Sequence, residues 1–142
     1  MNKKNIYWRV KKSKIHGTGV VASQDIKKGI KIIEYIGEKV KRSEGDKRSE
    51  KRIKKYLNSK NHGSVYIFEL NSRYDIDGSP SYNTARYMNH SCDPSCDVDI
   101  SKGHIWIVAD RDIKKGEELT YNYDYDFDDY EDHRCICGTK RC

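Results

Sequence analysis

The C-terminal cysteine pattern is one ligand short of a complete metal site. Three thiols lie within eight residues, in Cys135-Ile136-Cys137-Gly138-Thr139-Lys140-Arg141-Cys142, whereas a structural zinc ion is held by four ligands in a closed tetrahedron. The sequence favours Cys92 as the fourth ligand, in the turn-rich segment Asn89-His90-Ser91-Cys92-Asp93-Pro94. Cys96 competes for this role, although we interpret it as a small buried hydrophobe. The pattern therefore predicts a zinc site that joins two distant segments and orders a tail with little core of its own.

The composition indicates one domain in a reducing compartment. With 142 residues, the chain is long enough for one hydrophobic core. No apolar run approaches the roughly 18 residues of a membrane span, and the lysine-rich N-terminus lacks the apolar segment of a signal peptide. Cysteines that serve as metal ligands rather than in disulfides indicate an intracellular protein. We expect the nucleus or chromatin if the source is eukaryotic, and the cytoplasm otherwise.

Charge is distributed unevenly along the chain. The stretch from Lys41 to Lys60 holds nine lysines and arginines against three acids, and the stretch from Asp124 to Asp132 holds six acids and no base. A basic stretch can meet nucleic acid or an anionic membrane, and an acidic stretch can meet a basic peptide. A solvated surface is the default explanation for either, so function must be argued from other residues.

Most of the chain has the pattern of β-strands. Runs of β-branched and aromatic residues bounded by glycine or polar turns predict three strands, at Ile30–Ile36, Val65–Leu70 and His104–Ala109. A mainly β domain follows from this pattern.

Two helices are predicted between the strands. The first spans Asp46–Leu57, and because its apolar side is only Ile53, Tyr56 and Leu57, it should lie on the surface. The second is short, with Asn83 as its N-cap and residues 84–88 as its body.

One nine-residue pattern occurs twice. Val21-Ala22-Ser23-Gln24-Asp25-Ile26-Lys27-Lys28-Gly29 is echoed by Val108-Ala109-Asp110-Arg111-Asp112-Ile113-Lys114-Lys115-Gly116. We interpret each copy as a strand, a turn and the start of another strand, with the Lys-Lys-Gly corner exposed. Two copies do not make a solenoid, but they favour several small sheets over alternating strands and helices.

Several further motifs occur in a fixed order along the chain. They are Ile15-His16-Gly17-Thr18-Gly19-Val20, Glu34-Tyr35-Ile36-Gly37, Tyr66-Ile67-Phe68, Asn83-Thr84-Ala85-Arg86-Tyr87-Met88-Asn89-His90-Ser91-Cys92 and Gly116-Glu117-Glu118-Leu119-Thr120-Tyr121-Asn122-Tyr123. Followed by the closing cysteines, they resemble the SET-domain protein lysine methyltransferases, and the tail resembles their post-SET zinc segment. One departure is Tyr82, since relatives often carry glycine before the asparagine-containing helix.

The resemblance implies a mainly β architecture, the SET-domain (β-clip) fold. Several small sheets, one surface helix and a zinc-bound tail surround a C-terminal pseudoknot. In that knot, the strand with Tyr121 and Tyr123 threads the segment around Asn89-His90. Residues 1–126 would form the SET domain with an insert at about 41–62, and residues 127–142 would form the post-SET tail.

The resemblance also implies a reaction, transfer of a methyl group from S-adenosylmethionine to the side-chain amine of a lysine. The amine must be neutral, and its reference pKa of about 10.4 makes that form cost on the order of 4–5 kcal/mol at neutral pH. A desolvated channel next to a positive sulfonium lowers this pKa, and tyrosines suit its walls because each has an apolar ring and one polar tip. Tyr123 would be the catalytic tyrosine, with Tyr66 in the same pocket. Tyr121 would limit the product to mono- or dimethyl-lysine.

Two ligand sites are implied. The cofactor site would comprise His16, Gly17, Thr18, Gly19, Tyr66, Arg86, Asn89 and His90. The zinc ligands would be Cys92, Cys135, Cys137 and Cys142. On the residues alone, the glycines could equally form a tight turn, and Arg86 could equally be a surface arginine of a helix. We interpret His90 as a hydrogen-bonding strut rather than a general base.

The implied partner is a lysine-containing protein, with a histone tail as the first expectation. The basic 41–60 segment could contact nucleosomal DNA phosphates, and the acidic 124–132 segment could steer a basic peptide to the site. No membrane partner is expected.

Two other classes of function stay open at this stage. A zinc-stabilised module that binds chromatin or a peptide without turnover would keep the cysteines and the basic segment, and it would bind the cofactor without transferring methyl. A hydrolase with Cys92 as nucleophile beside a histidine would instead have a low-pKa, alkylatable thiol.

Overall fold

The computed structural model describes residues 6–15, 17–57 and 65–122, and the structural statements below concern these ranges. Their elements are β1 (Trp8–Lys12), β2 (Thr18–Ala22), β3 (Lys31–Tyr35), β4 (Glu38–Lys41), α1 (Arg42–Leu57), β5 (Ile67–Glu69), β6 (Tyr74–Asp77), the 3₁₀-helix η1 (Thr84–Tyr87), β7 (Asn89–His90), β8 (Cys96–Ser101), β9 (His104–Ala109) and β10 (Thr120–Tyr121). The prediction of a mainly β chain with a surface helix is confirmed. The predicted strand at 104–109 is found as predicted, whereas those at 30–36 and 65–70 are shorter.

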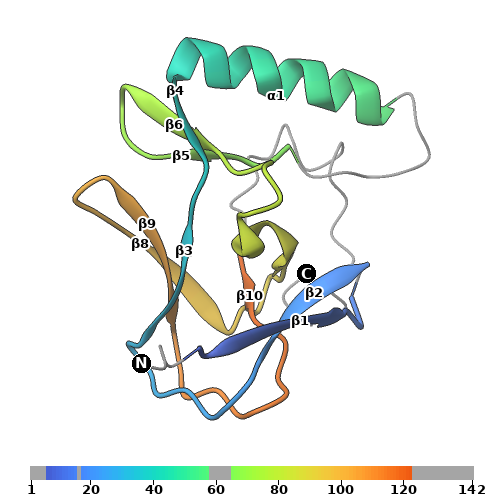
Figure 1. Cartoon of the computed structure of the whole chain (residues 1–142), viewed down its shortest axis with the longest axis vertical. Coiled ribbons are helices and arrows are strands. Elements are labelled where there is room, and N and C mark those ends of the chain that lie inside the picture. The colour runs from blue at the N-terminus through green and yellow to red at the C-terminus, as the bar shows by residue number, and fades with distance from the viewer. Residues whose placement is uncertain (1–5, 16, 58–64, 123–142) are drawn as a thin grey trace.

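The strands form four small sheets. Two contain three strands each, in the orders β3-β9-β8 and β4-β6-β5, and two are pairs, β1-β2 and β7-β10. All neighbouring strands are antiparallel except β7 and β10, which run parallel. In Figure 1, α1 lies over the β4-β6-β5 sheet at one end of the molecule, and the β1-β2 hairpin lies at the other.

The core lies where the small sheets meet. Along β9, burial alternates strictly, with Ile105, Ile107 and Ala109 inside and the residues between them partly or fully exposed. This is the period of two that a strand with one buried face requires. Val20 of β2 and Leu119, just before β10, are also fully buried, so the hairpin and the C-terminal segment share one core with the central sheet.

The two copies of the repeated pattern bond to each other. Ile26 and Ile113 exchange both backbone hydrogen bonds, with N···O distances of 2.8 and 2.7 Å, and each side chain is 1% exposed. The amide of Gly29 donates to Ala109 and the amide of Gly116 donates to Ala22, both at 2.8 Å. The copies therefore form a twofold-like joint, which we call the echo junction.

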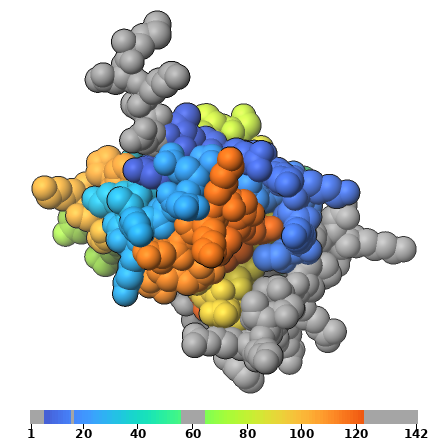
Figure 2. Space-filling model, turned by 90° about the horizontal axis from the view of Figure 1, so that it is seen from below, coloured from blue at the N-terminus to red at the C-terminus, as the bar shows by residue number. Residues whose placement is uncertain are grey.

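Carboxylates complete the symmetry of the echo junction. The Lys28 amide donates to Asp112 Oδ1 and the Lys115 amide donates to Asp25 Oδ1, both at 2.9 Å. The lysine side chains of both corners are exposed, as predicted. Figure 2 shows the first copy, in blue, beside the second, in orange, on one face of the molecule.

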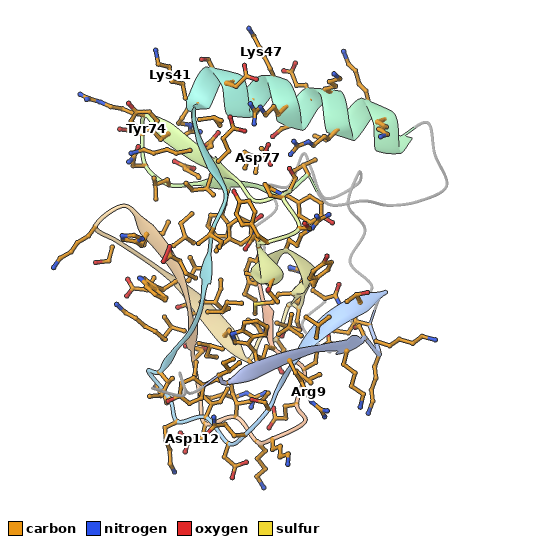
Figure 3. All side chains as sticks on the ribbon, viewed as in Figure 1. Arg9, Lys41, Lys47, Tyr74, Asp77 and Asp112 are labelled. Carbon is orange, nitrogen blue, oxygen red and sulfur yellow. The ribbon has the colours of Figure 1, made fainter. Side chains whose placement is uncertain are left out.

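α1 begins at Arg42, four residues earlier than predicted, and ion pairs attach it to the sheet beneath it. The Arg48 and Arg52 side chains bond the buried Asp77 carboxylate of β6 at 2.8–2.9 Å. Burial alone would raise the pKa of Asp77, but hydrogen bonds from Arg52 and Arg48 outweigh it and hold that pKa well below its usual range. Figure 3 shows Asp77 between α1 and the sheet, with Lys47 pointing away on the opposite side of the helix.

A close approach of the α1 backbone to the Asp75 side chain accompanies these ion pairs. Gly45 is buried within α1, and a Cβ at that position would lie 2.0 Å from Asp75 Oδ2. Of the predicted apolar side, Ile53 is half-buried, and the side chains of Tyr56 and Leu57 lie outside the described part of the structure. The apolar-face explanation of α1 was therefore incomplete, since it overlooked the arginines.

The second predicted helix is a single turn of 3₁₀-helix, η1. Asn83 occupies its N-cap position, but its side chain makes no capping hydrogen bond. Instead, Asn83 Oδ1 accepts from the Ile36 amide at 3.2 Å, and Nδ2 donates to the Gly78 carbonyl at 3.0 Å. The buried asparagine therefore joins η1 to two neighbouring turns rather than capping it.

Candidate functional site

The predicted cofactor loop is a tight reversal between β1 and β2. The Ser13 amide donates to the Gly17 carbonyl at 2.7 Å, and Gly17 has φ 51°, a conformation that favours glycine. A Cβ at Gly17 would meet none of the described atoms within 4 Å, its chain neighbours aside, so no other described residue fills the space beside that backbone. Thr18 and Gly19 begin β2, and His16 lies outside the described residues.

A carboxylate joins this loop to the Asn-His motif. Glu118 accepts from Ser13 Oγ at 2.7 Å and from Asn89 Nδ2 at 3.2 Å, and Asn89 Nδ2 also lies 2.9 Å from Ser13 Oγ. A Cβ at Gly19 would lie 2.9 Å from the Ser13 Cβ and 3.3 Å from Glu118 Oε2, so glycine is needed for the contact. The two predicted cofactor segments, far apart in sequence, are therefore brought together.

Sequence reasoning missed Glu118 as a site residue. It lies within the motif that contains Tyr121, but nothing in the sequence pairs a carboxylate there with Ser13 or Asn89. The only signal was position, since Glu118 comes shortly before the strand expected beside the Asn-His segment.

β7 and β10 place the Asn-His pair beside the tyrosine strand. Asn89 pairs with Thr120 and His90 with Tyr121, and the Ser91 amide donates to the Tyr121 carbonyl at 3.2 Å. This parallel pairing is the part of the predicted knot that the described residues contain. Tyr123, the predicted catalytic tyrosine, lies outside them.

An aromatic wall extends from Tyr121. The Phe68 ring centroid lies 6.1 Å from that of Tyr121 and 5.0 Å from that of Tyr35. Tyr121 and Tyr35 are buried, at 6% and 4% exposure. The wall is apolar and water-excluding, which raises the cost of a charged group placed against it.

Tyr66 adjoins this wall in an uncommon backbone conformation. Its φ is 60°, in the left-handed region that a bulky residue rarely adopts. Its carbonyl accepts from Tyr35 Oη and from the Gly78 amide, both at 2.8 Å. Such conformations persist only where the surroundings fix them, and they concentrate at functional sites.

Arg86 lies over the Tyr66 ring. The guanidinium carbon is 4.4 Å from the centroid of Tyr66 and 5.4 Å from that of Tyr87, and Nη1 donates to the Ser79 carbonyl. Arg86 Nε is buried and has no hydrogen-bond partner among the described residues. Arg86 thus contacts a predicted pocket residue rather than lying on the surface.

The site combines a glycine-containing loop, an Asn-His strand and a tyrosine strand in one place. A family model described as the SET domain matches residues 17–124, most of the chain. The chain belongs to the SET-domain family.

Full-length relatives agree with this assignment of the SET domain. The histone-lysine N-methyltransferase trithorax of Drosophila virilis is 41% identical over 140 residues, covering 96% of this chain and 4% of the relative. The histone-lysine N-methyltransferase trr of Drosophila melanogaster is 42% identical over 144 residues, covering 97% and 6%. The histone-lysine N-methyltransferase, H3 lysine-4 specific, of Aspergillus oryzae is 37% identical over 140 residues, covering 94% and 11%. The chain thus corresponds to a small part of each relative's length.

The two cysteines of the SET domain that the structure describes differ sharply. Cys92 is half-buried, and its sulfur lies 3.3 Å from His90 Nε2. Cys96 is 1% exposed, and burial raises the pKa of its thiol to about 11. A thiol that stays protonated in the core is a poor zinc ligand, so Cys96 is the small buried hydrophobe that was expected.

Cys135, Cys137 and Cys142 lie outside the described residues. Within the described ranges, no group of three or more histidine, cysteine or acidic residues is arranged to hold a metal ion. Among those residues there is also no helix long and apolar enough to cross a membrane.

Proposed function

We propose that this SET domain transfers a methyl group from S-adenosylmethionine to the side-chain amine of lysine in a basic protein, with a histone tail as substrate. The observation that carries the proposal is the Ser13–Glu118–Asn89 contact. It joins the glycine loop to the Asn-His strand, directly beside the strand with Tyr121. The names of the relatives support a histone substrate, and the Aspergillus oryzae relative is named as specific for H3 lysine 4.

The cofactor would lie against the loop at Gly17 and the strand at Asn89 and His90. The space beside Gly17, which no described residue outside the loop fills, leaves room for a bound group. When bound, the cofactor supplies an electrophilic methyl group on a positive sulfur. The loop and strand then have to hold that group in line with the incoming amine, and fixed orientation is a large source of rate.

The tyrosines would prepare the amine. Burial against Tyr35, Phe68 and Tyr121 disfavours the ammonium form, so the lysine loses its proton to solvent before the nitrogen attacks. The nitrogen lone pair then forms the new N–C bond as the S–C bond breaks, and the methylated amine releases one further proton. Tyr66, Tyr121 and Tyr123 would supply hydroxyls that orient the amine.

Tyr121 would set the number of methyl groups. A hydroxyl at this buried position can hold the amine, or a water, in the space that a further methyl needs. We therefore propose mono- or dimethylation, and Tyr121→Phe should raise the methylation state of the product. Mass spectrometry of a methylated peptide tests this, and trimethyl-lysine as the main wild-type product would contradict it.

A structural zinc ion would be held by Cys92, Cys135, Cys137 and Cys142. The half-buried Cys92 fits this role better than Cys96. The zinc would add no chemistry to the transfer and would serve to fix the tail. Cys137→Ser should lower the zinc content and the activity together, and unchanged zinc stoichiometry would refute the ligand set.

Nucleosomal DNA is the proposed second partner, which would place the protein on chromatin. Arg42, Arg48 and Arg52 form ion pairs, so the exposed cations of α1 are its lysines, with Lys47, Lys51, Lys54 and Lys55 among them. Reversing three of these charges should reduce the salt dependence of nucleosome binding by about one phosphate contact for each lysine that bound DNA. Lys114→Glu with Lys115→Glu, at the echo junction, is the control.

A radiolabelled methyl-transfer assay tests the main proposal. It would compare core histones, intact nucleosomes and unrelated basic proteins, with Tyr123→Phe as the inactive control. Label on one histone that is lost in the variant would establish the reaction and its substrate. Cofactor binding without transfer to any substrate would favour the non-catalytic binding module, and no cofactor binding would overturn the proposal.

The contact between His90 and Cys92 favours testing a second candidate function, a hydrolase with Cys92 as nucleophile. A histidine within 3.3 Å of a thiol is also the geometry of a cysteine nucleophile. Zinc ligation predicts that Cys92 is protected from alkylation until a chelator is added, whereas a nucleophilic Cys92 would be alkylated in either condition.

A further inference from the structure

The backbone at Tyr66 is fixed on both sides. A residue's φ and ψ are set by the two peptide planes that flank its Cα. The plane before Tyr66 carries the Val65 carbonyl, which accepts from Arg52 Nη1 at 2.7 Å. The plane after it carries the Tyr66 carbonyl, which accepts from Tyr35 Oη and the Gly78 amide. Side chains from α1 and β3 and the amide of Gly78 thus hold a conformation that tyrosine would otherwise avoid.

Glycine at position 78 makes this arrangement possible. A Cβ there would lie 2.4 Å from the Tyr35 ring, so any side chain would push the ring away from the Tyr66 carbonyl. The Gly78 amide is therefore both a holder of the Tyr66 conformation and a direct reporter of it.

Arg52 is itself held in place by Asp77. Its Nη1 and Nη2 bond the two Asp77 oxygens at 2.9 and 2.8 Å, while Nη1 also reaches Val65. Asp77 pairs with Ile67, the residue after Tyr66, in the β5-β6 ladder. α1, β6 and the backbone at Tyr66 are therefore linked by one continuous set of contacts.

We infer that Arg52 is a positioning residue for Tyr66. By holding the Val65 carbonyl, it sets the peptide plane before Tyr66 and so places the Tyr66 ring against the Arg86 guanidinium. α1 thereby helps shape the proposed pocket, although it lies at one end of the molecule (Figure 1). This inference rests on the proposed function, in which Tyr66 lines the pocket.

The test measures hydrogen exchange at the Gly78 amide together with methyl-transfer kinetics. In Arg52→Gln, exchange at Gly78 should accelerate on the order of tenfold, because local opening becomes easier. The value of kcat should fall by about tenfold, since small misplacements near the reacting atoms are costly, and KM for the cofactor should change less than kcat. Arg42→Gln is the matched control, because it removes an α1 arginine whose ion pairs are with Glu69 and Asp75 rather than with the peptides around Tyr66.

Arg52→Lys separates positioning from general stability. Lysine keeps a positive charge beside Asp77, but it lacks the planar fork that reaches the carboxylate and the carbonyl together. The melting temperature should therefore recover in Arg52→Lys, while Gly78 exchange and kcat should not. Recovery of all three would reduce Arg52 to a structural role and overturn the inference.

The two proposals fail in different measurements. Equal Gly78 exchange in Arg52→Gln and Arg42→Gln would overturn the positioning of Tyr66, whatever the enzyme does. Absence of methyl transfer by the wild type, with any substrate, would overturn the proposed function on its own.

Discussion

Two junctions join distant parts of this domain, and they differ in the forces that hold them. Below α1, the buried carboxylate of Asp77 forms ion pairs with Arg48 and Arg52. At the echo junction, Ile26 and Ile113 are packed in the core and exchange backbone hydrogen bonds. The first depends on ion pairs to a buried carboxylate, whereas the second depends mainly on apolar burial, with two carboxylates accepting amide hydrogen bonds at its exposed corners. Acid should therefore weaken the attachment of the helix directly, whereas the central contacts that close the core contain no group that ionises.

The largest effect is expected at the echo junction. Ile113→Ala would leave a cavity at a fully buried site and should lower the free energy of unfolding by about 3 kcal/mol. Urea denaturation measures this loss. Ile100→Ala is the control, because Ile100 is 44% exposed and its loss should cost less than about 0.5 kcal/mol. If Ile113→Ala lowered the free energy of unfolding no more than Ile100→Ala, apolar burial could not be what holds the echo junction.

A somewhat smaller effect is expected below α1. Asp77→Asn removes the charge shared by two arginines and should lower the free energy of unfolding by about 2 kcal/mol, because hydrogen bonds to charged groups are strong. Glu69→Gln removes an exposed partner of Arg42 and should cost less than about 1 kcal/mol. Denaturation of both variants checks the difference, and equal losses would mean that burial of Asp77 adds nothing.

The cofactor loop offers a third carboxylate junction. Glu118→Ala removes the acceptor shared by Ser13 and Asn89 and should weaken cofactor binding by about tenfold, the equivalent of one net hydrogen bond. Calorimetry with the cofactor measures this change. Glu117→Ala, which loses an ion pair with Arg111, should bind as wild type does, and equal weakening in both variants would contradict the assignment.

Acid should separate the two junctions. The folded-state pKa of Asp77 is depressed, so its contribution to stability is present above the unfolded pKa of about 4 and is lost as pH falls toward the folded value. The wild-type melting temperature should therefore fall more steeply below about pH 4 than that of Asp77→Asn. Parallel curves would show that Asp77 does not control acid stability.

The smallest expected change in stability is the most discriminating test, because it is a gain where the other variants lose stability. Asp75 lies on the same strand, and burial raises its pKa despite Arg42 at 3.8 Å. Ionised Asp75 therefore costs stability at neutral pH, so Asp75→Asn should slightly stabilise the fold where Asp77→Asn destabilises it. Thermal melts at neutral pH compare the two variants. Equal losses of stability in both would show that the arginine partners do not decide whether removing the charge stabilises or destabilises the fold.

Local patterns predicted local structure well. The run of β-branched and aromatic residues in His104–Ala109 predicted β9 to the residue, because such side chains favour an extended backbone. The start of α1 was missed because the apolar residues lie only in its second half, while Arg48 and Arg52 act through a carboxylate far away in sequence. The repeat was visible in the sequence, but its two copies could not be seen to pair, since a repeat does not say what each copy contacts.

The site was predicted only in part, because some of its residues act on partners from distant elements. The motifs gave Gly17, Asn89 and Tyr121 as candidates, and the structure brings their segments together. Neither Glu118 nor Arg52 carries a local signal, because each acts on a partner from another element. The left-handed backbone of Tyr66 was also invisible, since nothing about tyrosine itself favours that conformation.

The echo junction has a consequence for how the protein is made. Its hydrogen bonds join residues 84 and 90 positions apart, so the first copy has no partner until nearly the whole domain has been synthesised. At about 5–20 residues per second, Ile26 waits on the order of ten seconds for Ile113 to leave the ribosome. During that time the apolar face of an unfinished core stays available to other proteins, so we expect the nascent chain to depend on chaperones and to fold late rather than progressively.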